Sequence, residues 1–254
     1  MTRRSMLLAT AMIAAVARAQ AAEPLRIYGP GGPLPAMREA AEAFSHTHGT
    51  AVQVTAGPTP SWIDRARADA DLVFSGSEVM MSDFIAAMPD IDPASVMPLY
   101  LRPAAILVRP GNPGRIGGVA DLLRPGRRIL VVNGAGQQGL WEDVVGRLGD
   151  IASLRTFRSN IAVVAKNSAE ARQAWMQDLS LDAWLIWNIW QVANPTLADT
   201  VPIEPEYRIY RDTGIALTRR GTNRSEARQF AEFLAGPEGA RIFARWGWTA
   251  PASR

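Results

Sequence analysis

Apolar residues along this chain alternate between a strand-like spacing and a helix-like spacing. Short apolar runs bounded by turn residues predict strands, and apolar residues three or four positions apart predict amphipathic helices. In the N-terminal part this pattern predicts strands over 25–29, 51–55 and 71–75, and helices over 35–48, 61–68 (capped by Thr59 or Ser61) and 77–88. Alternating strands and helices form parallel sheets with right-handed crossovers. We therefore expect an α/β unit here.

A second alternation follows a long extended segment. The pattern predicts strands over 128–132, 161–165 and 182–187, helices over 118–123, 139–148 and 168–176, and two closing helices over 225–235 and 237–246. The extended segments over 98–109 and 206–218 separate the runs, and we expect them to cross side by side between two lobes. Ligands of such sheets bind beyond the carboxyl ends of the strands, and in a two-lobed protein we expect these ends to face each other across a cleft.

The first 21 residues have the pattern of a secretory signal peptide. Arg3 and Arg4 precede an apolar run over 6–17, and small residues at 17, 19 and 21 suit cleavage. The run is too short to cross a bilayer, which needs ~20 apolar residues. We expect a periplasmic protein with a mature N-terminus at Gln20 or Ala22 and no membrane span after cleavage. General secretion is preferred over twin-arginine export, and a buried N-terminal helix is the alternative.

Composition excludes several classes of protein. The chain has 254 residues, 48% of them hydrophobic and 20% charged, as in ordinary globular proteins. It has no cysteine, which excludes disulfides, thiolate metal sites and a cysteine nucleophile. Its two histidines, His46 and His48, end a predicted helix, and we expect no metal site. The signal carries three of the 27 basic residues, so the mature chain is near neutral and nucleic acid is not an expected partner.

Candidate chemistry lies in turns that leave a strand and enter a helix. Four of them, over 29–33, 75–78, 133–139 and 187–190, carry glycine, hydroxyl or amide residues. Glycine lets backbone N–H groups converge, and a helix N-terminus adds free donors and a positive dipole end. Each turn alone is ordinary loop chemistry. Together, at equivalent strand ends, they predict an anion site that needs no lysine or arginine.

Enzymatic and nucleotide-binding patterns do not occur. The turn that begins at Asn133 lacks the lysine of a phosphate-binding loop and the dinucleotide spacing. No Gly-x-Ser-x-Gly segment is present, and neither histidine has an evident nucleophile as a partner. We therefore expect no enzyme, no catalytic residues and no cofactor.

Several long motifs carry a family resemblance. The chain resembles the AcfC-type (accessory colonisation factor) branch of bacterial periplasmic solute-binding proteins in Tyr28-Gly-Pro-Gly-Gly-Pro, Thr55-Ala-Gly-Pro-Thr-Pro, Phe74-Ser-Gly-Ser-Glu, Asn133-Gly-Ala-Gly-Gln and Trp184-Leu-Ile-Trp-Asn-Ile-Trp. The similarity runs from about residue 25 to 248, and the chain is more distantly similar to sulfate- and molybdate-binding proteins. The resemblance implies an α/β, two-lobed type II periplasmic binding fold, with a mixed, mainly parallel sheet flanked by helices in each lobe and a double-crossover hinge. Beyond the signal peptide at 1–21, the first lobe would comprise 22–101 and 211–254, and the second 102–210.

The resemblance also implies a set of ligand-binding positions. In the oxyanion-binding relatives, strand-end turns of both lobes supply N–H, hydroxyl and aromatic groups. The matching positions here are Gly31, Gly32, Ser75 and Ser77 in the first lobe, and Ala135, Gly136, Gln137, Gln138, Trp187 and Asn188 in the second. Glycine stands where a first-turn serine is common, and Trp187 where tyrosine is common. Both departures weaken the expectation of an inorganic ligand.

These observations predict a monomeric, non-enzymatic periplasmic receptor. It would capture a sulfate- or molybdate-like anion and deliver it to an ABC-type permease or a sensor. The alternative ligand is a small organic acid whose carbon skeleton packs on Trp187 or Trp190. An alternative of another class is a secreted enzyme, or a colonisation factor without transport.

Overall fold

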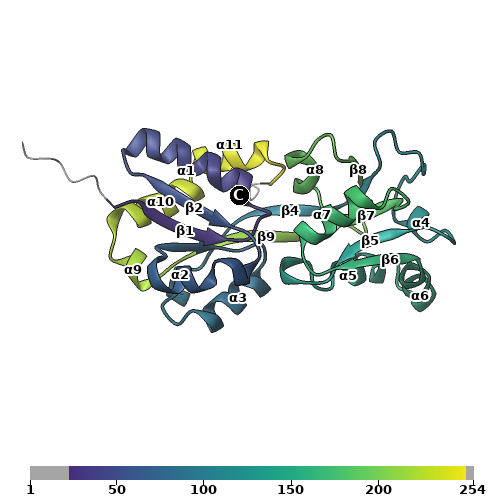
Figure 1. Cartoon of the computed structure of the whole chain (residues 1–254), viewed down its shortest axis with the longest axis horizontal. Coiled ribbons are helices and arrows are strands. Elements are labelled where there is room, and N and C mark those ends of the chain that lie inside the picture. Colours follow the sequence, from purple (N-terminus) through teal and green to yellow (C-terminus); the bar gives the residue numbers. More distant parts are fainter. Residues whose placement is uncertain (1–22, 250–254) are drawn as a thin grey trace, which may run out of the picture.

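Two long antiparallel strands, β4 (Met97–Val108) and β9 (Tyr210–Leu217), join the two halves of the protein. The structure is a computed structural model that describes residues 23–249, so the predicted signal peptide lies outside the described residues. In Figure 1 both strands pass through the middle of the molecule, and their register pairs Leu101 with Asp212 and Arg102 with Arg211. The extended segments that the sequence predicts therefore do run side by side.

The remaining strands extend the sheet on either side of this pair. The strand order is β2-β1-β3-β9-β4-β7-β5-β6, and β8 pairs with β4. Pairs β1/β2, β1/β3, β5/β6 and β5/β7 are parallel, while β4 and β9 pair antiparallel with their neighbours. The strand bounds are β1 Leu25–Gly29, β2 Val52–Ala56, β3 Leu72–Phe74, β5 Ile129–Val132, β6 Ile161–Ala165, β7 Ala183–Trp187 and β8 Asp199–Pro202.

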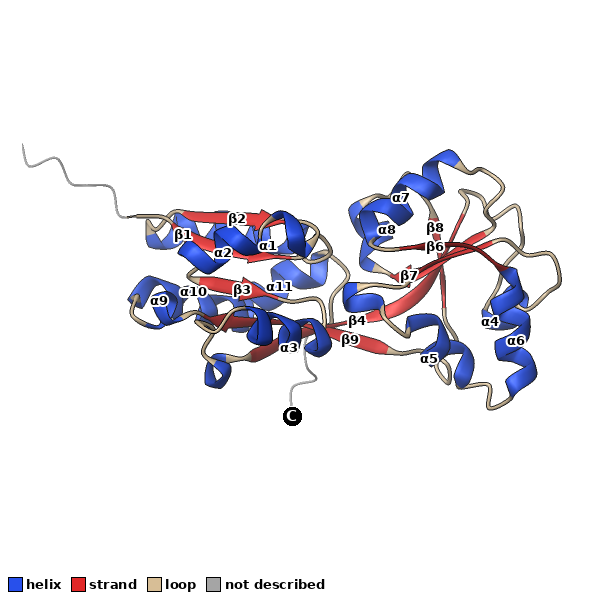
Figure 2. Ribbon diagram, turned by 60° about the horizontal axis from the view of Figure 1, so that its bottom comes forward, coloured by secondary structure: helices blue, strands red, loops and turns tan. Residues whose placement is uncertain are grey.

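Helices cover both faces of each half (Figure 2). The helices of the first half, where β1, β2 and β3 lie, are α1 Leu34–His48, α2 Ile63–Asp69, α3 Glu78–Ala87, α9 Arg219–Thr222, α10 Ser225–Ala235 and α11 Pro237–Arg245. Those of the second half are α4 Val119–Leu122, α5 Leu140–Gly146, α6 Ile151–Asn160, α7 Ser168–Gln177 and α8 Ile189–Ala193. No helix within residues 23–249 is long and apolar enough to cross a membrane.

Aromatic packing fixes the helices on the sheet. In the first half, the ring of Phe44 on α1 meets Phe230 on α10 edge-on, 5.1 Å between centroids. The ring of Tyr100 on β4 stacks on Phe243 of α11 at 4.5 Å. Complete burial of each such side chain contributes about 1.5–3 kcal/mol. The sheet whose strand ends carry the candidate turns is therefore held in place by well-packed helices.

The structure corrects the predicted start of the second helix. Instead of a helix over 61–68, a short 3₁₀ turn Thr59–Ser61 precedes α2, and no side chain caps the helix. The hydroxyl of Ser61 donates to the carbonyl of Pro58 at 2.7 Å. Buried Trp62 donates its indole N–H to the carbonyl of Gly57 at 3.1 Å, and its burial fixes the chain just before α2.

Candidate functional site

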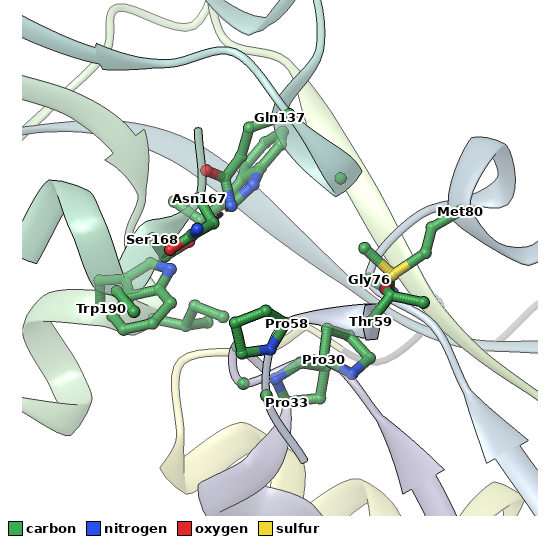
Figure 3. A pocket seen from close by; sticks show the side chains of 18 of the residues that line it. Pro30, Pro33, Pro58, Thr59, Gly76, Met80, Gln137, Asn167, Ser168 and Trp190 are labelled. Carbon is green, nitrogen blue, oxygen red and sulfur yellow. Dashed lines mark hydrogen bonds between the residues drawn. The ribbon is translucent and has the colours of Figure 1, made fainter. Parts of the chain in front are cut away.

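A cavity of about 120 Å³ lies where the two halves meet (Figure 3). Turns after β1, β2 and β3 of the first half form one wall, and turns after β5, β6 and β7 of the second half form the other. The lining residues are Pro30, Gly31, Gly32, Pro33, Gly57, Pro58, Thr59, Gly76, Met80, Arg102, Gly134, Gly136, Gln137, Asn167, Ser168, Ala169, Trp187, Ile189 and Trp190. All six turns stand at carboxyl ends of strands, where ligands of α/β sheets bind.

In the first half, the turn after β1 presents backbone donors to the cavity. Gly31 and Gly32 lie between two prolines, and α1 begins after the second of these with no acidic residue in its first turn. Their N–H groups donate to no other residue in the described part of the chain. A Cβ on Gly32 would lie 3.4 Å from the Ile189 side chain of the second half. The two halves are therefore in close contact here.

In the second half, the N-terminus of α7 faces the cavity. The side chain of Asn167 caps this helix by accepting the N–H of Glu170 at 2.9 Å. Ser168 and Ala169 follow in the first turn, where N–H groups have no partner within the helix. The hydroxyl of Ser168 accepts the amide N–H of Gln137 at 2.8 Å, and both side chains are labelled in Figure 3. A dipole end with free donors suits an anion.

Arg102 is a lining residue that the sequence did not predict. It is 3% exposed, and its guanidinium carbon lies 4.7 Å from the ring of Trp187 and 4.8 Å from the ring of Trp248. Burial lowers the pKa of Arg102 to about 9, against an opposing effect of Asp212, so the side chain is charged at neutral pH. The cavity therefore contains an arginine, whereas the turns alone predicted an anion site that needs no lysine or arginine. Arg102 stands in an apolar strand segment, which gives no local indication of a binding role.

Four lining side chains carry buried polar atoms that lack a hydrogen-bond partner among residues 23–249. The atoms are Nε of Arg102, Oε1 of Gln137 and the indole nitrogens of Trp187 and Trp190. An unsatisfied buried polar group costs about 1–3 kcal/mol, so such groups are rare and need an explanation. Four of the seven such atoms among residues 23–249 belong to residues that line the cavity, where a ligand with acceptors and one donor would satisfy them.

The structure places five of the predicted binding residues at the cavity, namely Gly31, Gly32, Gly136, Gln137 and Trp187. Trp184 is fully buried, while Trp190 lines the cavity together with Trp187. Ala135 begins the 3₁₀ turn Ala135–Gln137. Gln138 is exposed and is not among the lining residues.

Three other predicted residues hold the turns in place instead of lining the cavity. Ser75 accepts the N–H of Gly214 at 3.3 Å, and Ser77 caps α3 by accepting the N–H of Met80 at 3.2 Å. Asn188 donates its amide N–H to the carbonyl of Gly247 at 2.8 Å. These short polar side chains satisfy nearby backbone groups, which competes with binding a ligand.

Two lining turns are not among the four candidate turns that the sequence predicts. They are the segment Gly57-Pro58-Thr59 after β2 and the segment Asn167-Ser168-Ala169 after β6. Both leave a predicted strand and enter a predicted helix, and both carry a hydroxyl residue. The criterion that selected the other four turns, applied to every strand end, would have found them.

Comparison with known proteins identifies the family. A family model described as bacterial extracellular solute-binding protein matches residues 25–249. The structure of PEB3 with bound L-phospholactate is 34% identical, with a TM-score of 0.84 over 89% of this chain and 100% of that one. The structure of Peb3 from Campylobacter jejuni is 33% identical, with a TM-score of 0.83 over 89% of this chain and 100% of that one. No curated protein sequence matches the chain.

More distant structures share the fold. The sulfate-binding protein SubI from Mycobacterium tuberculosis is 19% identical, with a TM-score of 0.72 over 90% of this chain and 87% of that one. The periplasmic molybdate-binding protein of Azotobacter vinelandii is 19% identical, with a TM-score of 0.64 over 89% and 99%. The predicted periplasmic-binding-protein fold is confirmed. This chain belongs to the bacterial extracellular solute-binding protein family.

Proposed function

We propose that this protein is an AcfC-type periplasmic receptor that captures a small anion between two lobes and delivers it to an ABC-type permease or a sensor. The observation that carries the proposal is the convergence of turns from both halves, together with buried Arg102, on one cavity. In this proposal, 22–101 with 211–254 form the first lobe and 102–210 form the second. The strand pair β4/β9 is the hinge between them.

Within this class we propose a small organic acid as the ligand, ahead of an inorganic oxyanion. The cavity combines backbone donors with apolar side chains, among them Pro30, Pro33, Pro58 and Ile189. Apolar walls suit a carbon skeleton and add nothing to the binding of sulfate. The 34% identical PEB3 was crystallised with L-phospholactate, which supports the same ligand class. Membership of a solute-binding family supports binding without turnover.

Calorimetry tests the proposal. The chain from residue 22 onward is titrated with L-phospholactate, sulfate, molybdate and neutral glycerol. We expect one anion to bind per chain, an organic acid more tightly than sulfate, and no binding of glycerol. Failure of all three anions to bind would contradict the receptor proposal, and release of phosphate from L-phospholactate would favour an enzyme.

Tryptophan fluorescence locates the bound anion. Trp190 lines the cavity, while Trp141 stacks on Phe157 away from it, 5.4 Å between ring centroids. The ligand-induced emission change should shrink in Trp190→Phe and persist in the matched control Trp141→Phe. An unchanged response in Trp190→Phe would place the ligand elsewhere.

A further inference from the structure

Within residues 23–249, two arginines stack on tryptophan rings, and they differ in what their nitrogens contact. The guanidinium carbon of Arg109 lies 3.7 Å from the ring of Trp175. All three of its nitrogens donate to backbone carbonyls, those of Leu181, Trp175 and Asp178. Arg109 is not among the residues that line the cavity. Its hydrogen-bonding capacity is used within the fold, so its role is structural.

The guanidinium of Arg102 is enclosed but incompletely paired. Trp187 and Trp248 cover it at 4.7 and 4.8 Å. One nitrogen donates to the carbonyl of Gly76 at 2.6 Å, and a second makes a long contact of 3.4 Å with the carbonyl of Asp212. Nε is buried and donates to no residue in the described part of the chain. Arg102 therefore lines the cavity and keeps one hydrogen-bond donor, its Nε–H, that no described residue uses.

The positive charge of Arg102 also lacks an ion-pair partner. Within residues 23–249, no carboxylate oxygen lies within 4.0 Å of its guanidinium nitrogens. The carboxylate of Asp212 acts on it only from a greater distance, and Arg211 acts in the opposite sense. A buried charge is costly unless it is paired and fully hydrogen-bonded. An anion in the cavity would remove that cost.

We propose that Arg102 is the specificity-determining residue of the cavity and that the ligand's anionic head group is its missing counter-ion. The site then accepts solutes with a carboxylate or phosphate head and rejects neutral molecules of the same size. This inference rests on the proposed receptor function. Charge-assisted hydrogen bonds to arginine are roughly twice as strong as neutral ones, and stronger still where water is excluded.

The test compares three variants with the wild type by calorimetry, using L-phospholactate as the anionic probe and lactamide as the neutral one. Arg102→Gln should weaken L-phospholactate binding about 100-fold or more, by loss of the charged donors. Arg102→Lys keeps the charge but not the fork of donors, and should weaken binding about tenfold. Arg109→Gln, the matched control, should bind within about threefold of the wild type.

Thermal unfolding separates this role from a structural one. Without ligand, Arg102→Gln should unfold within about 5 °C of the wild type, because it also removes an uncompensated buried charge. L-phospholactate should raise the melting temperature of the wild type and leave that of Arg102→Gln unchanged. If Arg102→Gln does not fold, Arg102→Lys decides: weaker binding by a folded variant supports the inference, and unchanged binding overturns it.

The outcomes also separate this inference from the receptor proposal. Equal binding of L-phospholactate by the wild type and Arg102→Gln overturns the role of Arg102 and leaves the receptor standing. The same holds if the wild type binds lactamide as tightly as L-phospholactate. Failure of the wild type to bind L-phospholactate, sulfate or molybdate overturns both.

Discussion

Gly136 offers a direct test of contact between the two halves. It lies in the turn after β5 of the second half, and a Cβ there would lie 3.0 Å from the carbonyl oxygen of Gly76 in the first half. The same Cβ would lie 3.5 Å from a guanidinium nitrogen of Arg102. Gly136 does not have a positive φ, so alanine adds no backbone strain. The free-energy cost of Gly136→Ala therefore comes from the steric contact between the two turns.

The expected size of the effect follows from this contact. A carbon 3.0 Å from a carbonyl oxygen is too close, so the turns must separate by a few tenths of an ångström. Overpacking of this kind costs about 1–3 kcal/mol, which corresponds to an affinity loss of about 5- to 150-fold. In the proposed hinge mechanism the two turns meet only in the closed form, so the penalty falls on that form alone. The melting temperature without ligand should therefore stay near that of the wild type.

Calorimetry and thermal unfolding of Gly136→Ala measure both quantities. Gly146→Ala is the matched control, since it lies in α5 and its Cβ would meet no atom within 4 Å. The control should bind the ligand as the wild type does. Wild-type affinity in Gly136→Ala would refute the idea that these turns meet around the ligand. A loss of stability equal to the loss of affinity would show that the contact is permanent.

Four further predictions concern stability and processing. Asp71→Asn should lower the free energy of unfolding in urea by about 3–5 kcal/mol, since fully buried Asp71 pairs with two arginines at 2.8 and 3.1 Å, and a loss below 1 kcal/mol would contradict this. Ser77→Ala should cost about 1 kcal/mol of stability as a lost helix cap and leave the calorimetric affinity unchanged, whereas weaker binding would return Ser77 to the site. Burial and a hydrogen bond to Asp69 raise the pKa of Tyr28 from 10.0 to about 12. The contribution of Tyr28 to stability is therefore complete below pH 10 and is lost as the pH rises through 12. The melting temperature should fall less steeply across that pH range in Tyr28→Phe than in the wild type. Intact-mass measurement of periplasmic protein should place the N-terminus at residue 20 or 22, and retention of Met1 would contradict export.

Much of the fold can be predicted from the local spacing of apolar residues. The predicted strand over 25–29 and helix over 225–235 have the observed bounds of β1 and α10. Helix α6 (Ile151–Asn160) was missed because only Phe157 and Asn160 of it are buried, which leaves little apolar periodicity. Strand β8 was missed because it is short, pairs at an edge and is mostly exposed. The spacing of apolar residues reflects which positions are buried, so it does not predict elements that bury few residues.

The site was predictable where its chemistry is local to a turn. Gly31, Gly32 and Gly136 were found because glycine before a helix N-terminus is visible in the sequence. Arg102 was not, because its role depends on Trp187 and Trp248, which reach it only through the folded sheet. Ser77 has the right residue type at the right turn, yet its hydroxyl is taken by the helix that it caps. Residue type indicates what a side chain is able to bind, and the fold decides what it does bind.

In the proposed function, an anion is captured between two lobes that hinge on β4 and β9. Small-angle X-ray scattering measures this closure on the chain from residue 22 onward, with and without the anion that binds most tightly in calorimetry. Hinge closure around the ligand predicts a smaller radius of gyration at saturation, and no change on addition of neutral glycerol. An unchanged radius at saturating anion would contradict capture by closure.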